Sequence, residues 1–112
     1  MTEIKTKKYD LEERTFEFTK KTIEFINKLP KTISNNEIAK QLMRSSGSVG
    51  ANYIEANESL GKKDFILHIR ISRKEAKETI YWLKLLNSGA DDLIQEATEL
   101  MKIFGAILGK SQ

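Results

Sequence analysis

The spacing of the apolar residues constrains the fold of this chain more than any other feature of its sequence. Apolar side chains recur every three to four positions in four successive stretches. This spacing matches the period of an α-helix, about 3.6 residues per turn, and it gathers the apolar side chains of each stretch on one face. Pro30, Gly61, Ser88 and Gly89 separate the stretches, and glycine and proline interrupt helices. The sequence therefore predicts four amphipathic helices.

Capping signatures indicate where two of these helices begin. Asp10 is followed three residues later by Glu13, and Ser34 is followed three residues later by Glu37. In such a capping box, the first side chain and the glutamate each accept a hydrogen bond from a backbone N–H at the helix start. The expected helices run from Asp10 to Leu29, from Ser34 to about Ser59, from about Lys62 to Asn87, and onward from a cap between Ser88 and Asp91.

The four apolar faces predict one shared core. Connections of about three to five residues make successive helices antiparallel neighbours, and 112 residues are enough for one domain. We expect an all-α protein, an oligomeric antiparallel up-down-up-down four-helix bundle over residues 1–112, with residues 1–8 as a flexible basic arm. The expected core residues are Leu11, Thr15, Phe18, Thr22, Phe25, Leu29, Ile38, Leu42, Val49, Tyr53, Ala56, Leu60, Phe65, Ile69, Ala76, Ile80, Leu83, Leu93, Ala97, Leu100, Phe104 and Ile107.

The residue types available leave little room for catalysis. The chain has no cysteine and one histidine, His68. A di-iron site in a helical bundle needs a Glu-x-x-His motif on two helices, and here Phe65 occupies the position of that glutamate. The Arg-His pair of HEPN ribonucleases is also missing, because positions 61 to 63 hold Gly, Lys and Lys. We expect no enzyme activity, no metal and no cofactor, and an unrecognised carboxylate site is the remaining enzymatic alternative.

The sequence also predicts a cytoplasmic protein without membrane contact. The N-terminal residues carry no apolar run that could act as a signal peptide. Nowhere do about 18 apolar residues follow one another, which a membrane-spanning helix would need.

Positive charge is concentrated in the third helix. The whole chain has a net charge of +3, but residues 62–90 hold seven Lys or Arg against three Asp or Glu. A local basic face is typical of proteins that bind nucleic acid, an anionic membrane or an acidic protein. The alternative is an ordinary solvated helix face. The candidate nucleic-acid-binding residues, for RNA or DNA, are Lys63, Arg70, Lys74, Lys77 and Lys84 of this helix and Lys5, Lys7 and Lys8 of the arm.

A second apolar stripe lies on the third helix, almost opposite its core face. It contains Leu67, Ile71, Trp82 and Leu85 and is interrupted by Glu78. A monomeric bundle would leave these side chains in water, and exposed apolar patches usually mark interaction surfaces. We expect the stripe to be an oligomer interface; the alternative is that the neighbouring helices cover it.

The segment from Arg44 to Glu55 is rich in small residues although its pattern is helical. Two glycines there cost about 1 kcal/mol each relative to alanine, so another interaction must offset that cost. A phosphate-binding loop is one interpretation, but the Walker spacing is absent. We favour close helix packing, because Ser46 and Gly50, and likewise Gly47 and Ala51, form smooth ridges at a spacing of four residues.

Several segments of the chain resemble the four-helix bundle proteins of the 23S rRNA intervening-sequence family. The run RSSGSVGANYIEA is the most specific of them, and the similarity covers about residues 9–108. The segments that carry the resemblance are residues 9–16, 44–57, 63–65, 73–78 and 81–83.

The resemblance implies an all-α bundle that assembles as a homopentamer. Some members of the family are encoded within insertions in bacterial 23S rRNA genes. Related proteins of the same fold, the accessory variability determinants of diversity-generating retroelements, form basic pentamers that bind nucleic acid and a reverse transcriptase. By position in the family's motifs, the residues expected to form a buried or interfacial polar network are Arg44, Asn52, Glu55, Arg73 and Glu75.

Two functional hypotheses follow. The first is a non-catalytic oligomeric protein that binds RNA or DNA through its basic surfaces. The second is a structural or adaptor scaffold that binds another protein, with its lysines serving solubility. Arg73 does not favour one hypothesis over the other. Its side chain can pair with Glu55, Glu58, Glu75 or Glu78 as readily as it can contact a ligand.

Overall fold

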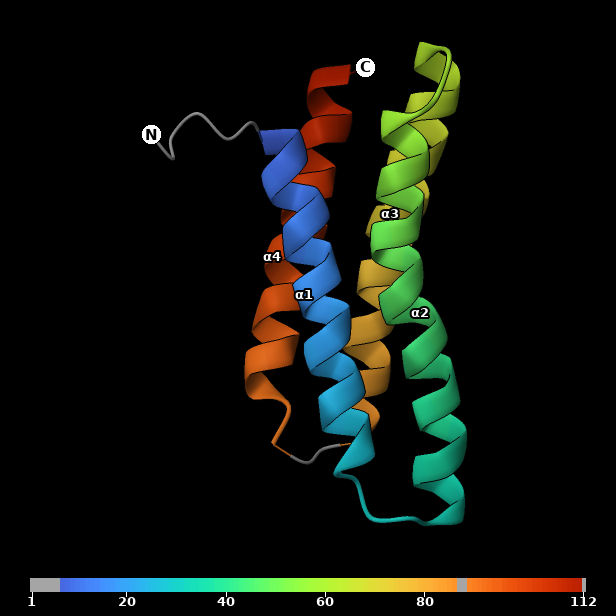
Figure 1. The fold of residues 1–112 in the computed structure, drawn as a ribbon, viewed down its shortest axis with the longest axis vertical. Helices are drawn as coiled ribbons and strands as arrows, with labels where there is room; N and C mark the ends of the chain where they lie inside the picture. Colours follow the sequence, from blue (N-terminus) through green and yellow to red (C-terminus); the bar gives the residue numbers. More distant parts are fainter. Residues whose placement is uncertain (1–6, 87–88, 112) are drawn as a thin grey trace.

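The chain folds into four α-helices and no strand over the residues described in the computed structural model, which are 7–86 and 89–111, with side chains from Leu11 onward. The helices are α1 (Lys7–Asn27), α2 (Ile33–Asn57), α3 (Lys62–Leu86) and α4 (Asp91–Ser111). Successive helices run in opposite directions (Figure 1). The expected antiparallel up-down-up-down bundle is confirmed.

Each helix packs against the two helices that adjoin it in the bundle. Helix α2 contacts α1 and α3, and α4 contacts α3 and α1. In Figure 1, α1 and α4 form one half of the bundle and α2 and α3 the other, with the C-terminus near the start of α1. The connection between α2 and α3 lies at this same end of the molecule.

The predicted apolar faces meet in the interior. One cluster centres on Phe18, Val49, Ile69 and Phe104, all but completely buried, and a second centres on Leu42 and residues at the end of α3. Burial of one such side chain stabilises the fold by roughly 1.5–3 kcal/mol. The helical period therefore identified most of the core. It missed Leu86, Ala90 and Leu108, which are buried, and it has one exception at the end of α2.

That exception is Leu60. Helix α2 ends at Asn57 rather than near Ser59, so Leu60 falls in the turn before α3 and is fully exposed. The position of Leu60 in the sequence would continue the apolar face of α2, but α2 ends before it reaches Leu60.

Two helices begin earlier than their capping signatures predicted. Helix α1 already includes Lys7, three residues before Asp10. Helix α2 is capped by Thr32, whose hydroxyl accepts a hydrogen bond from the Asn35 N–H at 3.0 Å, and not by Ser34. The Asn35 amide in turn donates to the Pro30 carbonyl at 3.0 Å, which fixes the turn ahead of the helix.

The connection from α3 to α4 uses a glycine for conformational reasons. Gly89 has a φ of +70°, a left-handed conformation that residues with a Cβ adopt at a steric cost. Helix α4 then begins with Asp91 and Asp92, whose negative charge complements the positive end of the helix dipole. Of the expected cap, Ser88 lies outside the described residues.

Candidate functional site

The cations of α3 lie together on the outward side of the bundle. Seven-residue spacing places Lys63, Arg70, Lys77 and Lys84 along one stripe, with Lys74 beside it, and all five are exposed. None of them forms an ion pair with another described residue. We call these five residues the basic stripe.

Two of the three acids of α3, Glu75 and Glu78, lie on a different flank, toward α2, whereas Asp64 lies beside Lys63. Asp64 is 3.6 Å from His68 Nε2, and Glu75 and Glu78 both contact Arg44 of α2. Glu75 and Glu78 are thus paired with an arginine while the cations of the helix face solvent. This separation of charge on one helix makes its outer surface electropositive.

Arg73 extends this basic surface toward α4. It is exposed, and its Cδ lies 3.8 Å from the position that a Cβ on Gly105 would take. Among the described residues it forms no ion pair with Glu55, Glu75 or the other acids considered for it. The reason is geometric: Arg73 and Glu75 are two positions apart on a helix and point to different sides.

The N-terminal lysines are placed only in part. Lys7 and Lys8 are the first two residues of α1, so the boundary expected for a flexible arm at residue 8 is corrected. Lys5 lies outside the described residues.

The second apolar stripe divides in the structure. Leu67 and Leu85 are exposed and Ile71 is half-buried. Trp82, however, packs against the buried cluster around Leu42 and contacts the Tyr81 ring edge-on at 4.9 Å between centroids. Trp82 therefore belongs partly to the core, because α2 reaches far enough around α3 to cover it.

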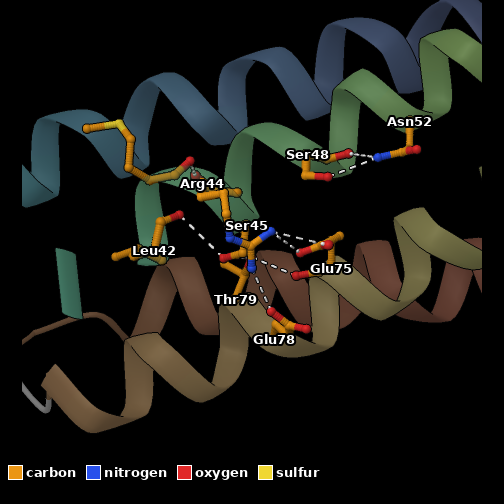
Figure 2. Close-up of polar contacts among 10 residues, drawn as sticks. Leu42, Arg44, Ser45, Ser48, Asn52, Glu75, Glu78 and Thr79 are labelled. Atoms are coloured by element: carbon orange, nitrogen blue, oxygen red, sulfur yellow. Dashed lines mark hydrogen bonds and ion pairs between the residues drawn. The ribbon is translucent and has the colours of Figure 1, made fainter. Parts of the chain in front are cut away.

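Arg44 links α2 to α3 through two glutamates (Figure 2). Its Nη1 donates to both Glu75 oxygens at 3.3 and 3.4 Å, and its Nη2 donates to Glu78 at 2.8 Å. Glu75 retains only 7% of its side-chain exposure, against 50% for Arg44. The hydrogen bond to Glu75, strengthened by charge, raises the pKa of Arg44 further above its ordinary value.

Other members of the expected polar network are placed apart from Arg44. Asn52 donates to the carbonyl and hydroxyl of Ser48, both at 2.9 Å, and its Oδ1 lies 3.1 Å from His68 Nδ1. Glu55 is exposed and joins neither group. The structure thus brings Arg44 and Glu75 together, and forms a separate link between α2 and α3 around Asn52.

The small-residue run of α2 serves helix packing. It is helical throughout, so its N–H groups are committed to helix hydrogen bonds and the phosphate-loop interpretation is wrong. A Cβ on Gly50 would lie 2.9 Å from the Thr15 hydroxyl of α1, and the Ser46 carbonyl accepts a bond from Thr19 at 2.9 Å. The ridge of Gly47 and Ala51 instead faces outward: no atom lies within 4 Å of a Cβ on Gly47, and Ala51 is exposed.

Hydroxyl groups complete the contact between α2 and α3. Ser72 donates to the Val49 carbonyl at 2.9 Å, and Thr79 donates to Ser45 at 2.9 Å. A serine side chain is short, so it reaches the backbone of a facing helix only where the two helices are close. Sequence reasoning identified the small residues of α2 but not these partners on α3.

A second arginine link, between α1 and α4, was missed by the sequence analysis. Arg14 donates to the two Glu96 oxygens at 2.6 and 2.9 Å and to Glu99 at 2.7 Å. The bond to Glu96 raises the pKa of Arg14 beyond its ordinary value. Hydrogen bonds from the Gln95 amide and from Arg14 lower the pKa of Glu99, and the bond from Gln95 has the larger effect.

A groove of about 760 Å³ runs along this side of the bundle. It is lined mostly by charged side chains, and acids outnumber bases in it. The lining residues are Glu13, Arg14, Glu17, Phe18, Lys21, Asp92, Leu93 and Glu96.

The described residues contain neither a cluster of metal ligands nor a helix that could cross a membrane. Among residues 7–86 and 89–111, no three His, Asp or Glu side chains are gathered as a metal site would need. No helix in this part of the chain combines the length and the apolar character needed to cross a bilayer.

Comparison with known proteins identifies a matching family and a similar solved structure. The family model described as "23S rRNA-intervening sequence protein" matches residues 7–105. Among solved structures, a protein of unknown function from the S23 ribosomal protein family of Bacteroides thetaiotaomicron VPI-5482 is similar, with a TM-score of 0.81 and 28% identity. The match covers 93% of this chain and 99% of that one. No curated protein matches the chain significantly.

Proposed function

This chain belongs to the 23S rRNA-intervening sequence protein family, and from that membership and its surface we propose that it is a non-catalytic homopentamer that binds nucleic acid through α3. The observation that carries the proposal is the separation of charge on α3. Glu75 and Glu78 are paired with Arg44 on the flank toward α2, whereas the basic stripe is exposed and forms no ion pair with a described residue.

Unpaired surface cations are suited to contact phosphates. Neutralising phosphates releases the counter-ions condensed on the nucleic acid, and this release supplies most of the affinity in non-specific binding. A cation already held by a carboxylate would first have to give up that partner. The basic stripe has no such cost to meet.

An aromatic side chain lies within the stripe. Tyr81 is 58% exposed and falls on the same side of α3 as Lys63 and Lys74. Bases of single-stranded nucleic acid stack on exposed aromatic rings, which contributes about 1–3 kcal/mol per base. This arrangement favours single-stranded or unpaired regions over a duplex.

Assembly would strengthen a weak site. One copy offers only a few unpaired cations, and a closed ring would repeat them around its circumference. Binding at one stripe raises the effective concentration of the strand at the next, so avidity exceeds the affinity of one copy.

Two lysines allow a direct test of the proposed surface. Lys77 and Lys84 lie on the flank of the stripe toward α4, away from Leu67 and Leu85. Replacing both with glutamine should weaken binding of labelled RNA and DNA oligonucleotides in fluorescence anisotropy. The slope of log affinity against log salt should become shallower by about 1.4–1.8, because each lost phosphate contact contributes about 0.7–0.9.

A matched variant controls for net charge. Lys28 and Lys31 are also exposed and form no ion pair with a described residue, but they lie in the connection between α1 and α2. Replacing both with glutamine removes the same charge. Equal losses in both double variants would overturn the site assignment. A wild-type protein that binds neither nucleic acid would overturn the function and favour the scaffold that binds another protein.

A further inference from the structure

We propose that neighbouring copies join through two different faces, with Phe16 and Ile54 of one copy packing on the Leu67 hollow of the next. The proposal rests on the oligomer of the proposed function and specifies its contact. The occupant of each face is therefore a second copy of this chain.

The first face spans α1 and α2. Phe16 is 62% exposed and Ile54 is 50% exposed, high values for large apolar side chains in regular helices. Gly47, on the same side of α2, has no side chain, and nothing lies within 4 Å of where its Cβ would stand. We define the α1–α2 apolar face as Phe16, Ile23, Met43, Gly47, Ala51 and Ile54.

Contacts between α1 and α2 bring these residues together. The close approach of Thr15 to Gly50, with the hydrogen bond from Thr19 to the Ser46 carbonyl, fixes the register of the two helices. In an antiparallel pair with this register, Phe16 lies level with the turn of α2 that precedes Ile54. The face is thus continuous across two helices, and the sequence stretches that supply it are far apart.

The second face lies on α3. A hollow of about 540 Å³ is lined by Lys63, Asp64, Ile66, Leu67 and Arg70. Leu67 is 51% exposed, so the hollow offers apolar contact. Its edge carries two cations, Lys63 and Arg70, and one acid, Asp64, so its formal charge is positive. A protruding apolar side chain with acidic neighbours would complement it.

The Ile54 end of the first face meets that description, whereas at the Phe16 end Lys20 Nζ lies 5.7 Å from the ring centroid. Ile54 is followed by Glu55 and Glu58, which are exposed and form no ion pair with another described residue. Two unpaired acids therefore adjoin Ile54, and two unpaired cations, Lys63 and Arg70, adjoin Leu67. Apolar surface would meet apolar surface, and opposite charges would meet at its edge.

The two faces also lie at the same level of the bundle. Asn52 of α2 contacts His68 of α3 within the chain, so Ile54 is level with about Leu67. In a ring whose axis runs along the bundle, neighbouring copies stand side by side without a shift. Ile54 of one copy would then reach the hollow of the next.

Two different faces predict a ring rather than a two-fold dimer. A two-fold dimer uses the same patch on both subunits, whereas a contact between unlike patches repeats until the ring closes. The contact takes up Lys63 and Arg70 and leaves Lys77 and Lys84 free on the flank toward α4. In the ring, the part of the basic stripe that can bind nucleic acid is therefore Lys74, Lys77 and Lys84.

The test uses one charged substitution on each face. Phe16→Glu damages the first face and Leu67→Glu the second, and each should reduce the mass measured by light scattering from the oligomer to the monomer. Mixed together, the two variants each retain one intact face, so they should form a one-to-one dimer that cannot grow further. Two unlike faces predict this pairing, and a contact between like faces does not.

Controls separate lost assembly from lost folding. Ile33→Glu adds the same charge at an apolar position that is 87% exposed and lies outside both faces, so it should keep the wild-type mass. Circular dichroism should show unchanged helicity in all three variants, and an unfolded Phe16→Glu or Leu67→Glu protein would show instead that the position supports the core and overturn its assignment to the interface.

The other possible outcomes separate a failure of the proposed contact from a failure of the oligomer itself. An oligomeric wild type whose mass survives either substitution, or two monomeric variants that do not pair, would overturn the proposed contact and leave the oligomer intact. A monomeric wild type would overturn the oligomer of the proposed function and this contact with it.

Discussion

The α2–α3 seam and the α1–α4 seam are both bridged by one arginine that contacts two glutamates of the facing helix. The surroundings of the two bridges differ. Between α2 and α3 the helices are close enough for Ser72 to bond the Val49 backbone at 2.9 Å. Between α1 and α4 a groove of about 760 Å³ remains, lined mostly by long charged side chains.

The comparison shows that side-chain size decides which seam closes. Ser45, Ser72 and Thr79 fill little space and are fully buried, so α2 and α3 approach each other. Arg14 and Glu96 are long and remain about one-third exposed, so they span a distance instead of closing it. The closed seam therefore depends on packing, and the open seam depends on charge.

The largest difference in stability between the two seams should appear when a bulky side chain is added to each of them. Ser45→Leu forces a larger side chain into a site that is fully buried, and overpacking of this kind costs about 1–3 kcal/mol. Ala106→Leu adds a similar bulk on α4 where the side chain is exposed beside Arg14, so its effect should stay within about 0.5 kcal/mol. Urea unfolding at one fixed protein concentration measures both. Equal losses would show that the two seams are packed alike.

The two arginines provide a second, smaller contrast. Arg14 has the shorter bonds, 2.6 to 2.9 Å against 2.8 to 3.4 Å for Arg44. Glu75, however, is 7% exposed, whereas Glu96 is 30% exposed. Removing Arg44 would leave a nearly buried charge without its partner, so Arg44→Ala should cost about 2 kcal/mol, between the values for buried and surface pairs. Arg14→Ala should cost about 1 kcal/mol or less, as for surface pairs.

A second substitution checks the reason for this order. If the cost of Arg44→Ala arises from the unpaired carboxylate, adding Glu75→Gln should restore part of the lost stability, because it removes that charge. Adding Glu96→Gln to Arg14→Ala should change little. An Arg14 variant that is less stable than the Arg44 variant would mean that bond geometry outweighs burial here.

Sequence reasoning was most successful where one helix alone carries the signal. The period of the apolar residues determined the four helices and most of the core, since each face can be read without knowing its neighbour. The same reasoning could not tell Gly47 from Gly50, because only the rotation of α2 against α1 decides that Gly50 meets Thr15 while Gly47 faces outward.

The surface features that were missed depend on residues distant in sequence. Arg14 and Glu96 are 82 positions apart, and neither belongs to a periodic pattern. Phe16 and Ile54 each look like a single stray apolar residue until the register of α1 and α2 places them on one face. Arg44 and Glu75 were grouped through the family resemblance rather than through their spacing, and the charge separation on α3 required knowledge of which acids are paired.

The smallest effect concerns pH and sharpens the account of the open seam. The Gln95 amide donates to Glu99 at 2.9 Å and Arg14 donates to it at 2.7 Å, and together these bonds lower the Glu99 pKa below its ordinary value of 4.5. The folded protein therefore binds this proton less readily than the unfolded chain. The resulting stability is fully present above that ordinary value and is lost as the pH falls through the lowered pKa of the folded state.

A carboxyl ¹³C titration by NMR should show Glu99 titrating below an unperturbed glutamate, and Gln95→Ala should move its midpoint upward, because it removes the largest cause of the shift. In unfolding measurements, the difference between wild type and Glu99→Gln should shrink on acidification. A difference that is constant with pH would mean that the Glu99 charge contributes nothing to the α1–α4 seam.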